Sequence, residues 1–244
     1  MTDVADRWDR ARAFIARQPG AAGQSGNVAE RLRRICGAAA QALPATGVGV
    51  SVMTDSGVRG FAAASDASSQ QVEELQFTLG EGPCVDAFAG RRPVLVAELG
   101  SSGMARWPMY AAAVHDRGVR AVFAFPLQVG AARIGVLDVF RDQPGAMTDE
   151  EVALALVFAE IALHAVLDGQ NDAPPGAVPE GFDEAPVFRA EISQAQGMIM
   201  IQLGVTIAEA LVRLRAYAYA EGRPLADVAR DVVARKLHFD ETQP

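Results

Sequence analysis

The sequence predicts an α+β protein, in which an antiparallel sheet flanked by helices is followed by a C-terminal bundle of three helices. Two long apolar runs, at 121–129 and 132–141, are separated by a turn that contains glycine, which is typical of a β-hairpin. Strand-like and helix-like segments alternate irregularly before them, and this favours an antiparallel sheet over a doubly wound parallel one. Between residues 192 and 237, three short amphipathic helical segments follow one another closely.

The elements of the larger domain follow in order. A helix at 3–17 carries Val4, Trp8, Ala11 and Ile15 on one stripe with coiled-coil spacing, so it either docks on its own domain or contributes to a dimer. A Thr-x-x-Glu capping box at 148–151 starts a long apolar helix that runs to about residue 167. The other expected elements are a helix at 28–43, paired strands at 48–53 and 58–64, a helix at 68–77, a turn and short helix at 79–88, a strand at 93–99 and a helix at 107–116.

The three helices of the bundle are marked by caps and apolar stripes. Gly204 ends the first helix, Thr206 and Glu209 form a capping box for the second, and Gly222 ends it. Gly197 lies inside the first helix, where it costs about 1 kcal/mol relative to alanine. We therefore expect something to approach the backbone closely at that position. The expected core faces are Ile192, Ala195 and Ile199; Ile207, Leu211, Leu214 and Ala218; and Leu225, Val228, Ala229, Val232 and Val233.

The chain of 244 residues is long enough for two modest domains. We divide it into an N-terminal helix and loop (1–27), a sheet domain (28–168), a linker rich in proline and acidic residues (169–186) and a three-helix domain (187–240). The net charge of −8 lies in the part before residue 186, because the remainder carries equal numbers of acidic and basic groups. That charge argues against a protein that coats nucleic acid non-specifically.

Composition also indicates the compartment. The two cysteines, Cys36 and Cys84, are far apart, there is no signal-peptide pattern, and no apolar run approaches the roughly 20 residues of a membrane span. We therefore expect a cytoplasmic protein without membrane association.

Motifs for catalysis or metal binding are not found in the sequence. It contains no phosphate-binding loop, no nucleophile elbow and no zinc-protease motif, and its three histidines lack ligand spacing. Glu81, Asp86 and Glu98 have no spacing that makes them a catalytic pair. We expect a protein that is not an enzyme, with no metal and no identified cofactor.

Two ordered sets of motifs resemble known families. The region from the first strand pair through LGEGPCVDAF and PVLVAEL to the hairpin FAFPLQVGAARIGVLDVF resembles a GAF domain. The C-terminal region resembles an ANTAR domain through QAQGMIM, the T-x-x-E-A start of the second helix, Leu214-Arg215 and LADVARDVV. Together they resemble the GAF–ANTAR architecture of bacterial regulators.

This resemblance implies a signal-responsive RNA-binding regulator, acting as a transcription antiterminator on paired hairpins in leader transcripts. The family commonly has Lys at the position of Gln196 and Arg at that of Gln202, so two positive charges are missing here. Arg213 and Arg215 each have a tyrosine four residues on, Tyr217 and Tyr219, which offers phosphate contact beside a stacking surface. The expected RNA-binding residues are Arg189, Gln196, Gly197, Arg213, Arg215, Tyr217 and Arg223.

The resemblance further implies a sensor domain that binds an unknown small molecule or serves to form a homodimer. A four-helix dimer interface is expected from the helix with Trp8 and the helix at 149–167. Two alternatives remain open for the bundle: a helix-turn-helix-like DNA reader, or a sensory scaffold that binds a protein partner. A ligand pocket between sheet and loops is expected to be lined by Phe61, Phe77, Leu79, Cys84, Phe123 and Phe125.

Overall fold

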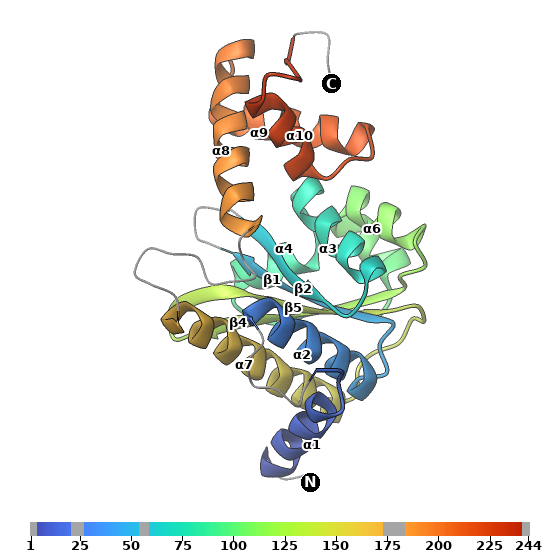
Figure 1. Cartoon of the computed structure of the whole chain (residues 1–244). Coiled ribbons are helices and arrows are strands. Elements are labelled where there is room, and N and C mark those ends of the chain that lie inside the picture. Colours follow the sequence, from blue (N-terminus) through green and yellow to red (C-terminus); the bar gives the residue numbers. More distant parts are fainter. Residues whose placement is uncertain (1–3, 21–26, 54–58, 173–183, 241–244) are drawn as a thin grey trace.

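The computed structural model describes residues 4–20, 27–53, 59–172 and 184–240 of the chain (Figure 1). At its centre lies a five-stranded antiparallel sheet with strand order β2-β1-β5-β4-β3, which confirms the predicted fold class. The predicted hairpin is present with its predicted bounds. The strands are β1 (Gly47–Met53), β2 (Arg59–Ala64), β3 (Val94–Val96), β4 (Ala121–Val129) and β5 (Ala132–Arg141).

Helices cover both faces of this sheet. One face is covered by α2 (Val28–Ala42) and α7 (Asp149–Asp172), with α1 (Val4–Ala16) packed on these two helices. The other face is covered by α3 (Ala67–Leu79), α4 (Pro83–Gly90) and α6 (Pro108–His115) (Figure 1). A π-helical turn, η1 (Leu99–Gly103), and the short α5 (Met104–Arg106) precede α6. Alternation along β5 sends Leu137 and Val139 to the first face and Val136 and Phe140 to the second.

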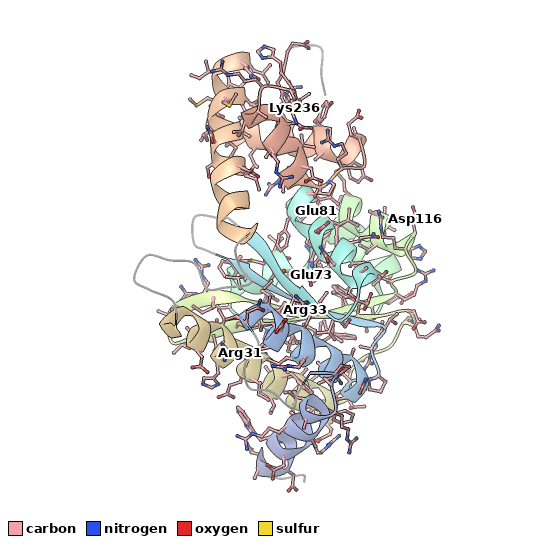
Figure 2. The ribbon with its side chains drawn as sticks, in the orientation of Figure 1. Arg31, Arg33, Glu73, Glu81, Asp116 and Lys236 are labelled. Carbon is pink, nitrogen blue, oxygen red and sulfur yellow. The ribbon has the colours of Figure 1, made fainter. Side chains whose placement is uncertain are left out.

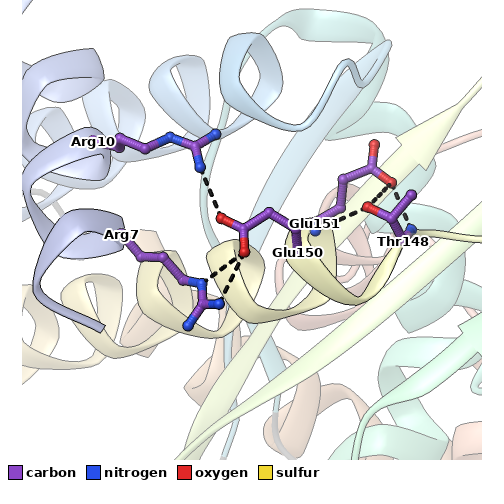
Figure 3. A network of polar contacts seen from close by, with 5 residues as sticks. All are labelled: Arg7, Arg10, Thr148, Glu150 and Glu151. Atoms are coloured by element: carbon purple, nitrogen blue, oxygen red, sulfur yellow. Dashed lines mark hydrogen bonds and ion pairs between the residues drawn. The ribbon is translucent and has the colours of Figure 1, made fainter. Parts of the chain in front are cut away.

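The N-terminal helix docks on its own domain. Trp8 and Ile15 are half-buried against the core and Ala11 is fully buried. At the start of α7, Glu150 accepts hydrogen bonds from Arg7 and Arg10, at 2.9 and 2.8 Å (Figure 3). The coiled-coil stripe predicted for a dimer interface is therefore largely used inside the chain, and only Val4 of the stripe is exposed.

The long helix α7 corrects one expectation from the sequence. Its segment Asp149–Gly169 has a mean hydropathy of 1.9 and is long and apolar enough to cross a membrane, although no such segment was expected. Half of that segment is buried in the sheet domain, with Leu154 and Phe158 almost entirely covered. Leu156, Glu160, His164 and Asp168 form its exposed stripe at spacings of four residues. The segment is thus packed as a core helix of this domain.

The predicted linker is partly helical. Helix α7 continues to Asp172, and α8 (Glu184–Leu203) begins within the segment 169–186 that was expected to be irregular. Residues 173–183 of that linker, and Val58 of the predicted second strand, lie outside the described residues. The third strand is also shorter than predicted, because only Val94–Val96 pairs with β4 at the edge of the sheet.

The C-terminal bundle consists of α8, α9 (Ile207–Ala220) and α10 (Leu225–Val233). Its capping box is confirmed, since Thr206 and Glu209 bond each other's backbone N–H groups. The predicted core face of α9 is wrong at Ile207, which is 52% exposed. The capping box begins the helix with Ile207 facing outward, and the face is completed instead by Ala210. The bundle core includes Ala195, Ile199, Ala210, Leu214, Ala218, Val228, Val232 and Phe239.

The bundle lies against the sheet domain on the side of α3. Helix α8 packs on β2, and α9 packs on α3 (Figure 1). The helix α3 therefore contacts the sheet with one side and the C-terminal bundle with another.

Candidate functional site

The two arginines of α9 point in different directions. They are two residues apart, which is about 200° around an α-helix. The Arg213 side chain is exposed and lies close enough to Glu209 to lower the pKa of that carboxyl, after the stronger effect of the hydrogen bonds from Thr206. Arg215 is half-buried. The two guanidinium groups therefore lie on different sides of α9.

Arg215 lies against the sheet domain. A Cβ atom added to Gly80 would lie 2.5 Å from Nη1 of Arg215 and 2.8 Å from Cζ, so the guanidinium lies directly against this glycine and would have to shift for any other residue. Gly80 is the left-handed C-cap of α3, with φ +71°. The carbonyl end of a helix carries partial negative charge and favours a cation by about 0.3–1 kcal/mol. Arg215, the residue of the ANTAR Leu-Arg pair, thus lies at the C-terminus of α3.

The backbone around Gly197 is open. Among the described residues, no atom lies within 4 Å of a Cβ added to Gly197, and neighbouring Gln196 is half-exposed. The close approach expected at this glycine is therefore not made by the described part of the chain. An external partner can reach the backbone of α8 here without displacing a side chain.

Other predicted RNA-binding residues have roles inside the bundle. The ring of Tyr217 lies 5.4 Å from that of Phe239, and Arg223 pairs with Asp231 at 2.6 Å. Gln202, which stands where the family commonly has arginine, accepts a hydrogen bond from the backbone N–H of Phe239 at 3.0 Å. Arg189 lies in α8, but its side chain is outside the described residues. Beyond the third predicted helix, Phe239 was missed because no periodic pattern continues there.

A second group of polar residues is buried inside the sheet domain, between β1, β5 and the helices α3, α4 and α6. Glu73 and Asp138 are both fully buried (Figure 2 shows Glu73 beside the sheet), and Glu73 accepts a hydrogen bond from Ser51 at 2.9 Å. Gln76 accepts one from the backbone N–H of Cys84 at 2.8 Å. We call this group the buried polar cluster; its members are Ser51, Glu73, Gln76, Cys84, Tyr110 and Asp138.

Small residues and one sharp turn make room for this cluster. Gly49 pairs with Asp138, and a Cβ on Gly49 would lie 2.5 Å from Oε1 of Glu73. Gly82 has φ +138°, which favours glycine, and a Cβ there would lie 2.5 Å from Oε1 of Gln76. Glu81 directly precedes Gly82 in the chain and is labelled in Figure 2. Its carboxylate accepts hydrogen bonds from the backbone N–H groups of Met109 and Tyr110 at the start of α6, both at 2.8 Å.

Burial dominates the electrostatics of the cluster. It raises the pKa of Asp138 to about 7 and, together with the charge of Asp138, raises the pKa of Glu73 well above its usual range. Burial and the neighbouring Asp138, Glu73 and Cys84 raise the pKa of Tyr110. The phenol of Tyr110 is thus within electrostatic reach of the two carboxyl groups and the thiol.

The residues predicted to line a ligand pocket do not lie together. Phe123 and Phe125 belong to the core on the α2 and α7 face of the sheet, whereas Cys84, Phe77 and Leu79 belong to the opposite face. The prediction of one shared pocket is wrong for the two strand phenylalanines, because odd positions of β4 face α7. The side chain of Phe61 is outside the described residues.

Sequence reasoning did not single out Glu73 and Asp138. A charged residue within the apolar run of β5, at the same parity as Val136 and Phe140, is a signal that could have revealed Asp138. The row Gly47, Gly49 and Ser51 on one face of β1 was a second signal, because small residues let α3 approach the sheet.

The fold defines a class of two-domain protein, with an α+β sensor-type domain and a three-helix C-terminal module. The family model of the GAF domain matches residues 25–166, and that of the ANTAR domain matches residues 182–233. The chain belongs to the GAF domain family and carries a C-terminal ANTAR domain. GAF and ANTAR domains are sensory and regulatory modules, so the chain is a signal-sensing regulator, which fits the expectation that it is not an enzyme.

Individual relatives are distant. The chain is 23% identical over 233 residues to a Nif-specific regulatory protein of Herbaspirillum seropedicae, and the match covers 89% of this chain and 41% of that protein. Among solved structures, it is similar to the GAF domain of a phosphoenolpyruvate-protein phosphotransferase of Coxiella burnetii, with 16% identity and a TM-score of 0.54. That match covers 70% of this chain and 98% of the GAF domain, and supports the fold alone.

Proposed function

We propose that this chain is an RNA-binding antiterminator that recognises paired hairpins in leader transcripts under control of its GAF domain. The observation that carries the proposal is the ANTAR bundle with an exposed Arg213 and an open backbone at Gly197. Unpaired bases in hairpin loops offer faces and edges that side chains can bind. Its place of action is the cytoplasm, where leader transcripts are made, and the described residues Cys36 and Cys84 form no disulfide.

A contact between the domains supports control by the GAF domain. Arg215 lies at the C-terminus of α3, where it is half-buried against the sheet domain. Because such a contact contributes only about 0.3–1 kcal/mol, a ligand that binds the two domain arrangements with different affinity can release it. In the released state both arginines of α9 become accessible, and RNA binding strengthens.

A gel-shift experiment tests the proposal with RNA that carries two tandem hairpins, at low and moderate salt. We expect wild-type protein to bind this RNA in preference to duplex DNA, and affinity to fall as salt rises. Absence of binding at both salt concentrations by folded protein would refute RNA recognition. Preference for duplex DNA would support the helix-turn-helix alternative. Against that alternative, Arg230 pairs with Asp227 of α10, and Arg223 pairs with Asp231 of α10, so both arginines already have acidic partners.

Substitutions of Arg213 and Arg215 form a matched pair that tests whether the contact between Arg215 and α3 must be released before RNA binds. If the closed arrangement binds RNA, Arg213→Ala lowers the salt slope by about 0.7–0.9, the value for one phosphate contact, while Arg215→Ala leaves it unchanged. If Arg215 is released from α3 before RNA binds, both substitutions lower the salt slope. An unchanged slope for both variants would exclude these two residues as phosphate contacts.

A protein-binding scaffold is a second candidate function. It is favoured by the exposed apolar side chains Ile201, Ile207 and Val212, which are 76%, 52% and 62% accessible. Capture of a protein but no RNA from a cell lysate would favour this candidate over RNA binding.

We also propose that the chain acts as a homodimer, through the exposed stripe of α7 and the outer surface of α1. Leu156 is an apolar member of that stripe, and Val4 is exposed on α1. Light scattering tests this: a mass of one chain at all accessible concentrations would contradict a dimer, and Leu156→Arg serves as a variant that should dissociate it.

A further inference from the structure

The buried polar cluster contains more polar atoms than it satisfies. Among the described residues, five of its buried atoms have no partner in good hydrogen-bond geometry: Glu73 Oε1, Gln76 Nε2, Tyr110 OH and both carboxylate oxygens of Asp138. Glu73, Cys84 and Gln76 nevertheless lie close enough to the Asp138 carboxyl to counteract the rise in its pKa, so the polar groups converge on one point. A buried polar group without a partner costs about 1–3 kcal/mol, and more when it is charged. Such a concentration of unpaired atoms at one place indicates that the cluster is completed by something outside the chain.

The donor atoms of the cluster define the chemical class of that ligand. A carboxylate oxygen of Glu73, one of Asp138 and the Sγ of Cys84 all lie within 4.8 Å of one another, from α3, β5 and the start of α4. Two carboxylates side by side repel each other unless a proton or cation neutralises them. A thiolate beside carboxylates selects a divalent transition cation such as Zn²⁺ over Mg²⁺ or Ca²⁺, which prefer oxygen ligands only.

We propose that Glu73, Cys84 and Asp138 form a binding site for a zinc-class divalent cation in the core of the GAF domain. Three protein ligands leave one position of a tetrahedral cation open. The Nε2 group of Gln76 and the Tyr110 hydroxyl supply hydrogen bonds for a water molecule or small anion at that position. Binding displaces the proton of the Cys84 thiol to solvent, together with any carboxyl protons.

The position of this site links it to the C-terminal bundle through α3. Only this link to RNA binding rests on the proposed function. Glu73 and Gln76 lie in α3, whose C-cap, Gly80, contacts Arg215. Drawing Glu73 and Asp138 onto a common cation moves the last two turns of α3 relative to β5. The site therefore couples the cation to the α3–α9 contact.

Titration of the intact, metal-free chain with Co²⁺ tests the site without reference to RNA. We expect one equivalent to bind and give a thiolate-to-cobalt absorption band, which Zn²⁺ removes and Mg²⁺ does not. Cys84→Ser should abolish that band, and Asp138→Asn should weaken Co²⁺ binding by about tenfold or more. Cys36→Ser is the matched control, because Cys36 is equally buried but lies on α2, on the other face of the sheet.

Thermal unfolding separates a cation site from an internal hydrogen-bond network. We expect Zn²⁺ to raise the Tm of wild type and of Cys36→Ser, whereas Asp138→Asn is as stable as metal-free wild type, or more stable, and its Tm rises less with Zn²⁺. Absence of the band and of the Tm shift in the wild type, or their retention in Cys84→Ser, would overturn the proposal. Loss of RNA binding with an intact cobalt band would instead contradict the proposed function.

Discussion

Replacing Gly197 with alanine should move stability and RNA affinity in opposite directions. A methyl group at this position meets no described atom within 4 Å, so it introduces no internal clash. Alanine in the interior of α8 is favoured over glycine by about 0.5–1 kcal/mol. For a chain of this size that gain corresponds to a rise in Tm of about 1–4 °C, which calorimetry measures.

The same methyl group obstructs a partner that approaches the backbone of α8. If RNA contacts the chain there, the crowding costs about 1–3 kcal/mol, or roughly a 5- to 150-fold loss of affinity in a gel shift. Ser193→Ala, one turn earlier in α8, is the matched control because it raises helix propensity without adding volume. Unchanged affinity in Gly197→Ala would refute contact at this glycine, and a lower Tm would show that the site is not open.

Three further predictions concern the framework of the two domains. Gly49→Ala should destabilise the GAF domain by about 1–3 kcal/mol in urea unfolding, because its Cβ would lie 2.5 Å from the Glu73 carboxylate; wild-type stability would contradict this packing. Leu214→Ala should cost about 2–5 kcal/mol because Leu214 is fully buried in the bundle, whereas half-buried Leu211→Ala should cost less, and equal losses would contradict the core assignment. Partial burial tends to raise the pKa of Glu151, but the Thr148 N–H and Arg141 outweigh it and lower the pKa below 4.5 (Figure 3). The resulting stabilisation is present above pH 4.5 and is lost as the pH falls through the folded-state pKa, so the difference between wild type and Glu151→Gln should shrink on acidification; a difference independent of pH would refute this linkage.

Local signals in the sequence predicted most of the framework. The hairpin of β4 and β5 and the capping boxes at Thr148 and Thr206 depend on residues close together in the chain, and the structure confirms them. Phe123 and Phe125 were assigned to the wrong face of the sheet, because strand parity alone does not say which helices cover each face. The order of motifs sufficed for the two families, since each motif is local.

The site depended on contacts that a linear sequence does not reveal. Glu73 and Asp138 are far apart in the chain and meet only because α3 packs on β1 and β2, and β1 pairs with β5. The orientation of Arg215 follows from the packing of one domain on the other, which no motif within either domain encodes. Gln202 was expected to weaken RNA binding through a missing charge, whereas the structure gives it a hydrogen bond to the backbone of Phe239.

The most direct test of the RNA-binding account is sequencing of the RNA that co-purifies with the intact protein, with Arg213→Ala as the matched control. The account predicts that wild type is enriched in leader segments that can form paired hairpins, and that this enrichment decreases in Arg213→Ala while the protein stays folded. Recovery of no RNA, or of the same RNA in equal amounts with both proteins, would contradict it.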